Sequence, residues 1–119
     1  MRLIGSRTEA IEREELLRSN QALQDGNDAL SAALSTVGVD RTNAYVVGWV
    51  PDQSEDIISV LVSEDHVLIL EIDKLGKVLD VKRHGFDEYR SQRSNSARIK
   101  MDVARDLIRQ GREKAGISR

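Results

Sequence analysis

Four arginines near the end of the chain share one stripe of a predicted helix, because they are spaced seven, four and three residues apart. They are Arg98, Arg105, Arg109 and Arg112. A row of guanidinium groups can make forked contacts with the phosphates of a nucleic acid. Carboxylates at Asp102, Asp106 and Glu113 lie on the adjoining strip, at the spacing of surface ion pairs. The stripe therefore predicts either a nucleic-acid-binding surface or a solvated face whose charges pair within the chain.

A second group combines carboxylates with a lysine. Pro51-Asp52 is followed by Asp80-Val81-Lys82, and Asp56 is followed by Glu71-Ile72-Asp73 with Asp in place of Lys. A helix, a hairpin, an Asp and then an acidic residue two before a Lys form a layout similar to that of the PD-(D/E)xK nucleases. This resemblance implies two carboxylates that hold Mg²⁺ and a lysine that orients water. A degenerate nuclease of this kind is one alternative function.

Other catalytic groups are scarce. The chain has no cysteine, and neither His66 nor His84 has a partner at the spacing of a metal site. The eight glycines form neither a phosphate-binding loop nor a dinucleotide-binding motif. We therefore expect a protein that is not an enzyme and that needs no cofactor or metal.

Length and composition indicate one globular domain of 119 residues, with 39% hydrophobic and 32% charged residues. The start of the chain has no long apolar stretch, so we expect no signal peptide, no membrane span and a cytoplasmic location. Residues 82–119 contain eleven Lys or Arg and five Asp or Glu, whereas residues 1–81 contain seven and fifteen. This asymmetry predicts either a charged partner or attraction between the two parts of the fold.

Residues 8–37 are predicted to form one long helix, capped by Thr8 and ended by Gly38. Its apolar residues recur every seven positions, with amides at the heptad positions between them, a pattern typical of parallel two-stranded coiled coils. The residues proposed for self-association are Leu16, Asn20, Leu23, Asn27, Leu30 and Leu34. The alternative is a helix that packs these leucines on its own sheet and leaves the asparagines in water.

Residues 44–83 contain four β-branched runs, 44–50, 57–62, 66–72 and 77–82, with connections short enough to require antiparallel neighbours. They predict a four-stranded meander in which Gly76 supplies a positive φ at the last turn. The two middle runs are apolar on both faces, whereas the last run alternates and belongs at an edge or over solvent.

Residues 86–115 are predicted to form one basic amphipathic helix that docks on the meander. The resulting fold class is α+β, a long N-terminal helix, a four-stranded antiparallel meander and a long C-terminal helix. Because helices on one face leave the other face of the middle strands open, a second molecule is expected to cover it. The sequence thus favours a non-enzymatic adaptor that forms a homodimer and binds a macromolecular partner, most simply a protein.

Overall fold

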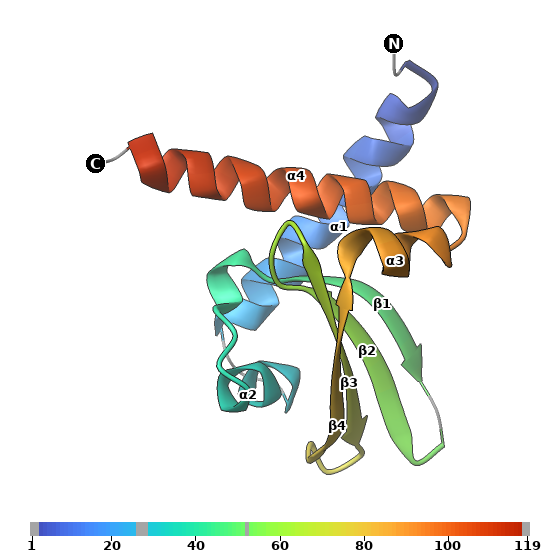
Figure 1. Ribbon diagram of the computed structural model, residues 1–119, viewed down its shortest axis with the longest axis vertical. Helices are drawn as coiled ribbons and strands as arrows, with labels where there is room; N and C mark the ends of the chain where they lie inside the picture. The colour runs from blue at the N-terminus through green and yellow to red at the C-terminus, as the bar shows by residue number, and fades with distance from the viewer. Residues whose placement is uncertain (1–2, 26–28, 52, 118–119) are drawn as a thin grey trace.

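The predicted α+β fold is confirmed by a computed structural model, which describes residues 3–25, 29–51 and 53–117, with side chains for residue 7 and for residues 9–25, 29–51 and 53–111. The elements are α1 (Leu3–Asp25), α2 (Ala29–Thr36), the 3₁₀ turn η1 (Arg41–Asn43), β1 (Tyr45–Pro51), β2 (Glu55–Leu61), β3 (His66–Asp73), β4 (Val78–Gly85), α3 (Phe86–Ser91) and α4 (Asn95–Ile117) (Figure 1). Within these residues no helix combines the length and the apolarity that a membrane crossing requires.

The sheet is the predicted antiparallel meander, in the order β1-β2-β3-β4. Gly76 has a φ of 89° at the last turn, where the Asp73 carboxylate accepts hydrogen bonds from the backbone N–H groups of Leu75 and Lys77. β4 pairs with β3 and forms the edge of the sheet, as its alternating sequence predicts. A bulge between Glu71 and Ile72 leaves Leu79 of β4 without an opposite residue.

The N-terminal helix differs from its prediction. α1 begins at Leu3, before Thr8, and ends at Asp25, and the separate helix α2 crosses below the end of α1 (Figure 1). The prediction of one helix over 8–37 is therefore wrong. Residues 26–28, which include the poor helix formers Gly26 and Asn27, lie outside the described residues. Gly38, with a φ of 81°, ends α2 as predicted, because Val39 N donates to the Leu34 carbonyl at 2.9 Å.

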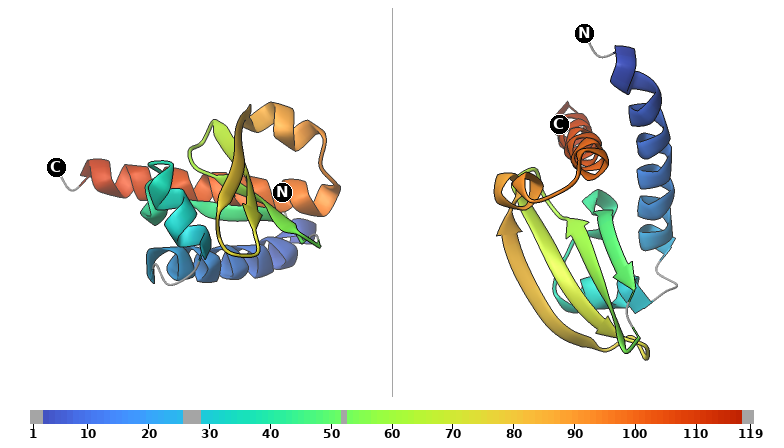
Figure 2. Two further views of the ribbon diagram at one scale, coloured as in Figure 1. Left: turned by 90° about the horizontal axis from the view of Figure 1, so that it is seen from below. Right: turned by 90° about the vertical axis from the view of Figure 1, so that its right-hand side faces the viewer.

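The single helix predicted over 86–115 is also two helices, α3 and α4. Residues 92–94 separate them, and the Ser94 hydroxyl accepts a hydrogen bond from Ala97 N at 3.3 Å. This is the geometry of an N-cap, which satisfies a backbone donor in the first turn of α4. α3 and α4 then meet the sheet as a bent pair (Figure 2).

One face of the sheet, here named the α4 face, packs against α3, α4 and part of α1. The buried cluster on this face comprises Leu16, Tyr45, Val47, Leu61, Val67, Phe86, Tyr89, Met101, Val103, Ala104, Leu107 and Ile108. The amphipathic face predicted for the C-terminal helix is therefore buried. Tyr89 crosses over Gly48, where a side chain would meet its hydroxyl, and donates to Ser59 Oγ at 2.7 Å.

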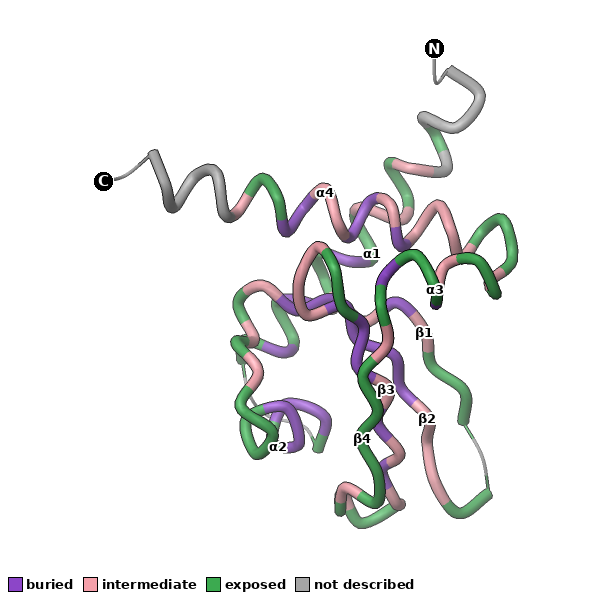
Figure 3. Tube along the Cα trace, viewed as in Figure 1, coloured by how far each residue is buried: buried purple, intermediate pink, exposed green. Residues whose placement is uncertain are grey.

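The opposite face, here named the α2 face, is covered as well. Its cluster comprises Leu23, Leu30, Ala33, Leu34, Ala44, Ile58, Val60, Leu68, Leu70 and Ile72. The prediction that one face of the middle strands stays open is therefore wrong, because the break after Asp25 allows α2 to fold onto that face. β4 is exposed along most of its length (Figure 3). The exposed large apolar side chains of the described residues are Trp49 and Val50 on β1, Leu79 and Val81 on β4, and Ile11, Leu17, Val37 and Leu75 elsewhere.

Candidate functional site

The predicted arginine stripe is bonded within the chain at each of its three described members. Arg98 donates from Nε to the Arg90 carbonyl at 3.2 Å and from Nη2 to the Ser91 carbonyl at 3.0 Å, which satisfies the last carbonyls of α3. The guanidinium of Arg105 stacks on Phe86, 4.1 Å from the ring centroid. Arg109 Nε donates to Glu64 Oε1 at 2.7 Å. The side chain of Arg112 lies outside the described ones.

Two of these arginines line a charged groove between α1, α3 and α4, a cavity of about 430 Å³. Its lining is Glu9, Arg13, Asp87, Arg90, Asp102, Val103, Arg105, Asp106 and Arg109, so four guanidinium groups face four carboxylates. Arg90 makes a forked pair with Asp102, both bonds 2.8 Å, and this pairing raises the pKa of the Arg90 guanidinium. Arg13 bonds Asp106 at 3.1 Å. A polyanion entering the groove would meet as many carboxylates as guanidinium groups, so the groove fits a joint between helices better than a phosphate track.

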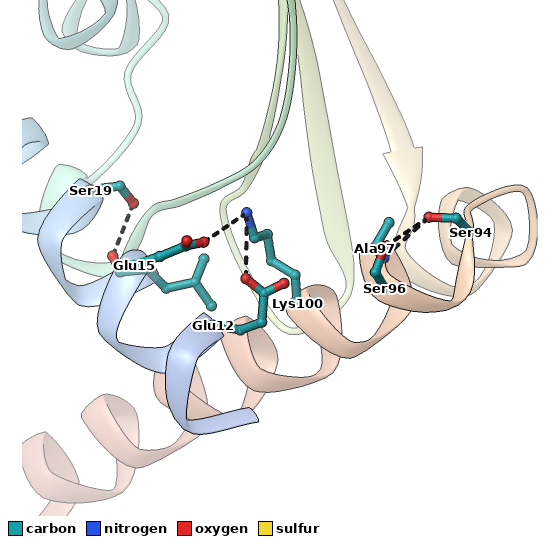
Figure 4. Close-up of polar contacts among 8 residues, drawn as sticks. Glu12, Glu15, Ser19, Ser94, Ser96, Ala97 and Lys100 are labelled. Carbon is teal, nitrogen blue, oxygen red and sulfur yellow. Dashed lines mark hydrogen bonds and ion pairs between the residues drawn. The ribbon is translucent and has the colours of Figure 1, made fainter. Parts of the chain in front are cut away.

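Lys100 of α4 forms a second joint with α1. Its ammonium lies 3.8 Å from Glu12 Oε1 and 3.6 Å from Glu15 Oε2 (Figure 4). Burial at this contact raises the pKa of Glu12, Lys100 opposes the rise, and Glu15 adds to it. Like the contact between Arg109 and Glu64, this joint pairs the basic C-terminal part with the acidic body of the chain. These pairs fit the interpretation that the charge asymmetry reflects attraction between the two parts of the fold.

The raised pKa of Glu12 predicts how stability depends on pH. Because the folded chain holds this proton more tightly than the unfolded chain, the contribution of Glu12 to the free energy of unfolding falls as pH rises from about 4 through its raised folded pKa. We expect Glu12→Gln to lack this fall, so that the variant gains stability relative to the parent between acidic and neutral pH. Urea unfolding over that pH range measures the difference, with Glu14→Gln, exposed on the same helix, as the control. Parallel pH profiles for the parent and Glu12→Gln would contradict the expectation.

The residues predicted for a coiled coil lie mostly inside the fold. Leu16, Leu23, Leu30 and Leu34 are each at most 5% exposed. Asn20 is also buried, and its Nδ2 donates to three carbonyls around η1, those of Arg41, Thr42 and Ala44, at 3.0, 3.2 and 2.8 Å. The leucines therefore pack on the chain's own sheet, the alternative that the sequence left open, but Asn20 is not in water. Asn27 lies outside the described residues.

The structure separates Asp56 and Glu71, the two carboxylates of the second nuclease-like match, although Glu71 lies opposite Asp80 of the first match. Asp56 lies opposite Ile72, and Glu71 lies opposite Ile57, so the two acids project from different faces of the sheet. Asp56 pairs with Lys74 at 2.8 Å. Asp80 and Lys82 are on the outer strand β4, and Asp52 lies outside the described residues. Among the residues that the structure describes, no three His, Asp or Glu side chains form a group that could hold a metal ion.

The edges of the sheet carry the exposed apolar side chains that these patterns do not explain. On the β1 edge, Trp49 is 53% and Val50 is 59% exposed, and on the β4 edge, Leu79 is 48% and Val81 is 37% exposed. Beside Trp49 a cavity of about 190 Å³ has Leu30, Ile58 and Ile72 in its lining. The sequence indicated that the last strand lies at an edge, but sequence reasoning did not identify either edge as a binding surface. The available signal was the apolar side of the alternation, Leu79 and Val81.

Comparisons with known proteins add no relative. No family model matches the sequence, and neither a curated protein nor a solved structure matches it. The function is therefore inferred from the surface of the chain itself.

Proposed function

We propose that the chain is a cytoplasmic, non-enzymatic interaction protein that self-associates as a dimer and binds a protein partner. The observation that carries this proposal is the exposure of Trp49, Val50, Leu79 and Val81 at the two edges of the sheet. Strand edges present unpaired N–H and C=O groups to other chains, and apolar side chains beside them add the area that stabilises a contact.

The β1 edge supports the binding of a partner other than a second copy. Trp49 is the sole tryptophan of the chain, and a half-exposed indole next to an apolar cavity is the kind of side chain that dominates protein interfaces. Asp56 and Lys74, which also line that cavity, form an ion pair beside its apolar wall. Such a combination suits an apolar side chain with a polar neighbour, as a folded protein or a peptide offers.

Sedimentation equilibrium tests the self-association, from about 1 to about 100 µM, the range in which modest interfaces assemble. We expect a dimer at the upper end of this range, and a monomer throughout would overturn the self-association. A second run with short duplex DNA at low salt tests nucleic-acid binding as the competing function. Binding that falls steeply with salt and weakens in Arg105→Gln would favour the arginine stripe over the proposed function.

A further inference from the structure

The outer side of β4 is an unpaired strand edge. β4 pairs with β3, and in the right-hand view of Figure 2 it forms the margin of the sheet away from α1. In an antiparallel ladder, successive residues direct their N–H and C=O groups alternately toward and away from the neighbouring strand. Phe86 N donates to the Asp65 carbonyl on the β3 side at 2.8 Å, so Lys82 and His84 face β3. The backbone groups of Val81 and Arg83 therefore face outward.

From this edge we infer that a second copy of the chain adds its own β4 antiparallel to the first, with Val81 on the two-fold axis. The inference rests on the proposed function and specifies the dimer contact. Val81 would exchange both backbone hydrogen bonds with the partner subunit's Val81. This pairing joins two residues whose backbone groups both face outward, as an antiparallel ladder requires.

The charges on β4 select this register. Asp80 and Lys82 share one face of the strand, where the Lys82 ammonium lies 3.8 Å from the Asp80 carboxylate. With Val81 on the axis, Asp80 lies opposite the partner subunit's Lys82, and the symmetry repeats the attraction. An axis at Lys82 would set two lysines opposite each other, and an axis at Asp80 would set two carboxylates opposite each other, both unfavourable. Of the axes at Asp80, Val81 and Lys82, only the one at Val81 makes the β4 edge complementary to itself.

Apolar burial favours the same arrangement. Val81 lies opposite Leu70 on the α2 face, and its exposed side would meet the partner subunit's Val81 there. The sheet would continue as eight strands, and its apolar α2 face would extend across the axis. Because the ladder is short, we expect a dissociation constant on the order of 10 µM.

Charge reversal tests the register. We expect Asp80→Lys and Lys82→Asp each to weaken dimerisation about tenfold, because each turns both attractions into repulsions, and we expect the double variant to restore it. Both residues are exposed, so the variants should fold, which circular dichroism checks. Glu14→Lys, exposed on α1 across the sheet, makes the same charge change as Asp80→Lys and should leave dimerisation unchanged. A double variant that dimerises no better than the single variants would overturn the register.

Cross-linking separates the failure of this inference from the failure of the proposed function. The chain has no cysteine, so Val81→Cys introduces a unique thiol at the axis, within reach of its symmetry mate, and mild oxidation should link two copies. Leu75→Cys, at a residue 95% exposed in the β3–β4 turn, should not link, because the two turns lie at opposite ends of the ladder. A parent dimer with no link at Val81→Cys would overturn the β4 contact and leave self-association standing. A parent monomer would overturn both.

Discussion

Replacing Asn20 with aspartate lowers the free energy of unfolding by about 3–5 kcal/mol at neutral pH, the cost of an uncompensated charge in a buried site. Asn20 is 5% exposed, and its Nδ2 donates to the carbonyls of Arg41, Thr42 and Ala44. A carboxylate at this position would direct negative charge at three acceptors that have lost their donor. The chain segment that connects α2 to β1 would then lose its attachment to α1.

The sign of the pH dependence makes this prediction specific. Because burial among carbonyls favours the protonated acid, the folded state of Asn20→Asp should have a raised pKa at this position, and the variant should lose stability as pH rises above about 4. Chemical denaturation at acidic and neutral pH measures the effect. Asn95→Asp, at an exposed residue in the first turn of α4, makes the same change and should stay within about 0.5 kcal/mol of the parent. Equal stability of the parent and Asn20→Asp at neutral pH would contradict the buried role of Asn20.

Leu23→Ala should cost about 2–5 kcal/mol of unfolding free energy, because it leaves a cavity in a packed core. Leu23 is 1% exposed and belongs to the cluster between α2 and the sheet. If Leu23 instead lay in a coiled-coil interface, its truncation would dissociate a dimer and leave a stable monomer. We therefore expect Leu23→Ala to unfold at a lower denaturant concentration than the parent. In the absence of denaturant, the dissociation constant of its dimer should equal that of the parent.

Leu17 provides the matched control for Leu23. It lies on the same helix but is 47% exposed, so Leu17→Ala should change the free energy of unfolding by well under 1 kcal/mol. Equal stability losses for the two variants, or a folded monomer produced by Leu23→Ala alone from a dimeric parent, would show that the heptad leucines do not form the core described above.

The strands could be predicted closely because their determinants are local. The β-branched runs are joined by short polar turns, which can connect only antiparallel neighbours. Gly76 supplies the positive φ that the last turn needs. The alternation of Leu79 and Val81 with Asp80 and Lys82 marked β4 as an edge for the same reason. Each of these inferences needs only residues a few positions apart.

The helices were harder, because their ends and their packing depend on distant contacts. Ser94 caps the start of α4 and so interrupts an otherwise helical pattern, because its hydroxyl accepts a hydrogen bond from Ala97 N. A serine within a helical pattern is a weak sequence signal for such a cap. The heptad pattern of α1 was real, but periodicity does not distinguish a dimer interface from a face that packs on the chain's own sheet. In the structure Leu23, Leu30 and Leu34 pack on the chain's own sheet, because α2 is a separate helix that covers the α2 face.

Ion-pair partners were predicted only in part. Spacing along one helix pairs Asp102 with Arg98 or Arg105, and Asp106 with Arg109. In the structure Asp102 bonds Arg90 of α3 and Asp106 bonds Arg13 of α1, while Arg109 reaches Glu64 in the β2–β3 turn. The sequence therefore indicated that the charges could be paired within the chain, but the crossing of the helices selected the partners.

Hydrogen exchange at the backbone amide of Val81 tests the β4 contact most directly. This amide faces outward from the sheet, whereas the neighbouring amide of Lys82 faces β3 and serves as an internal control. We predict that Val81 exchanges fast well below the dissociation constant of the dimer and slowly well above it, while Lys82 stays protected at both concentrations. Fast exchange of Val81 in a fully dimeric sample would contradict the pairing of β4 with a second copy.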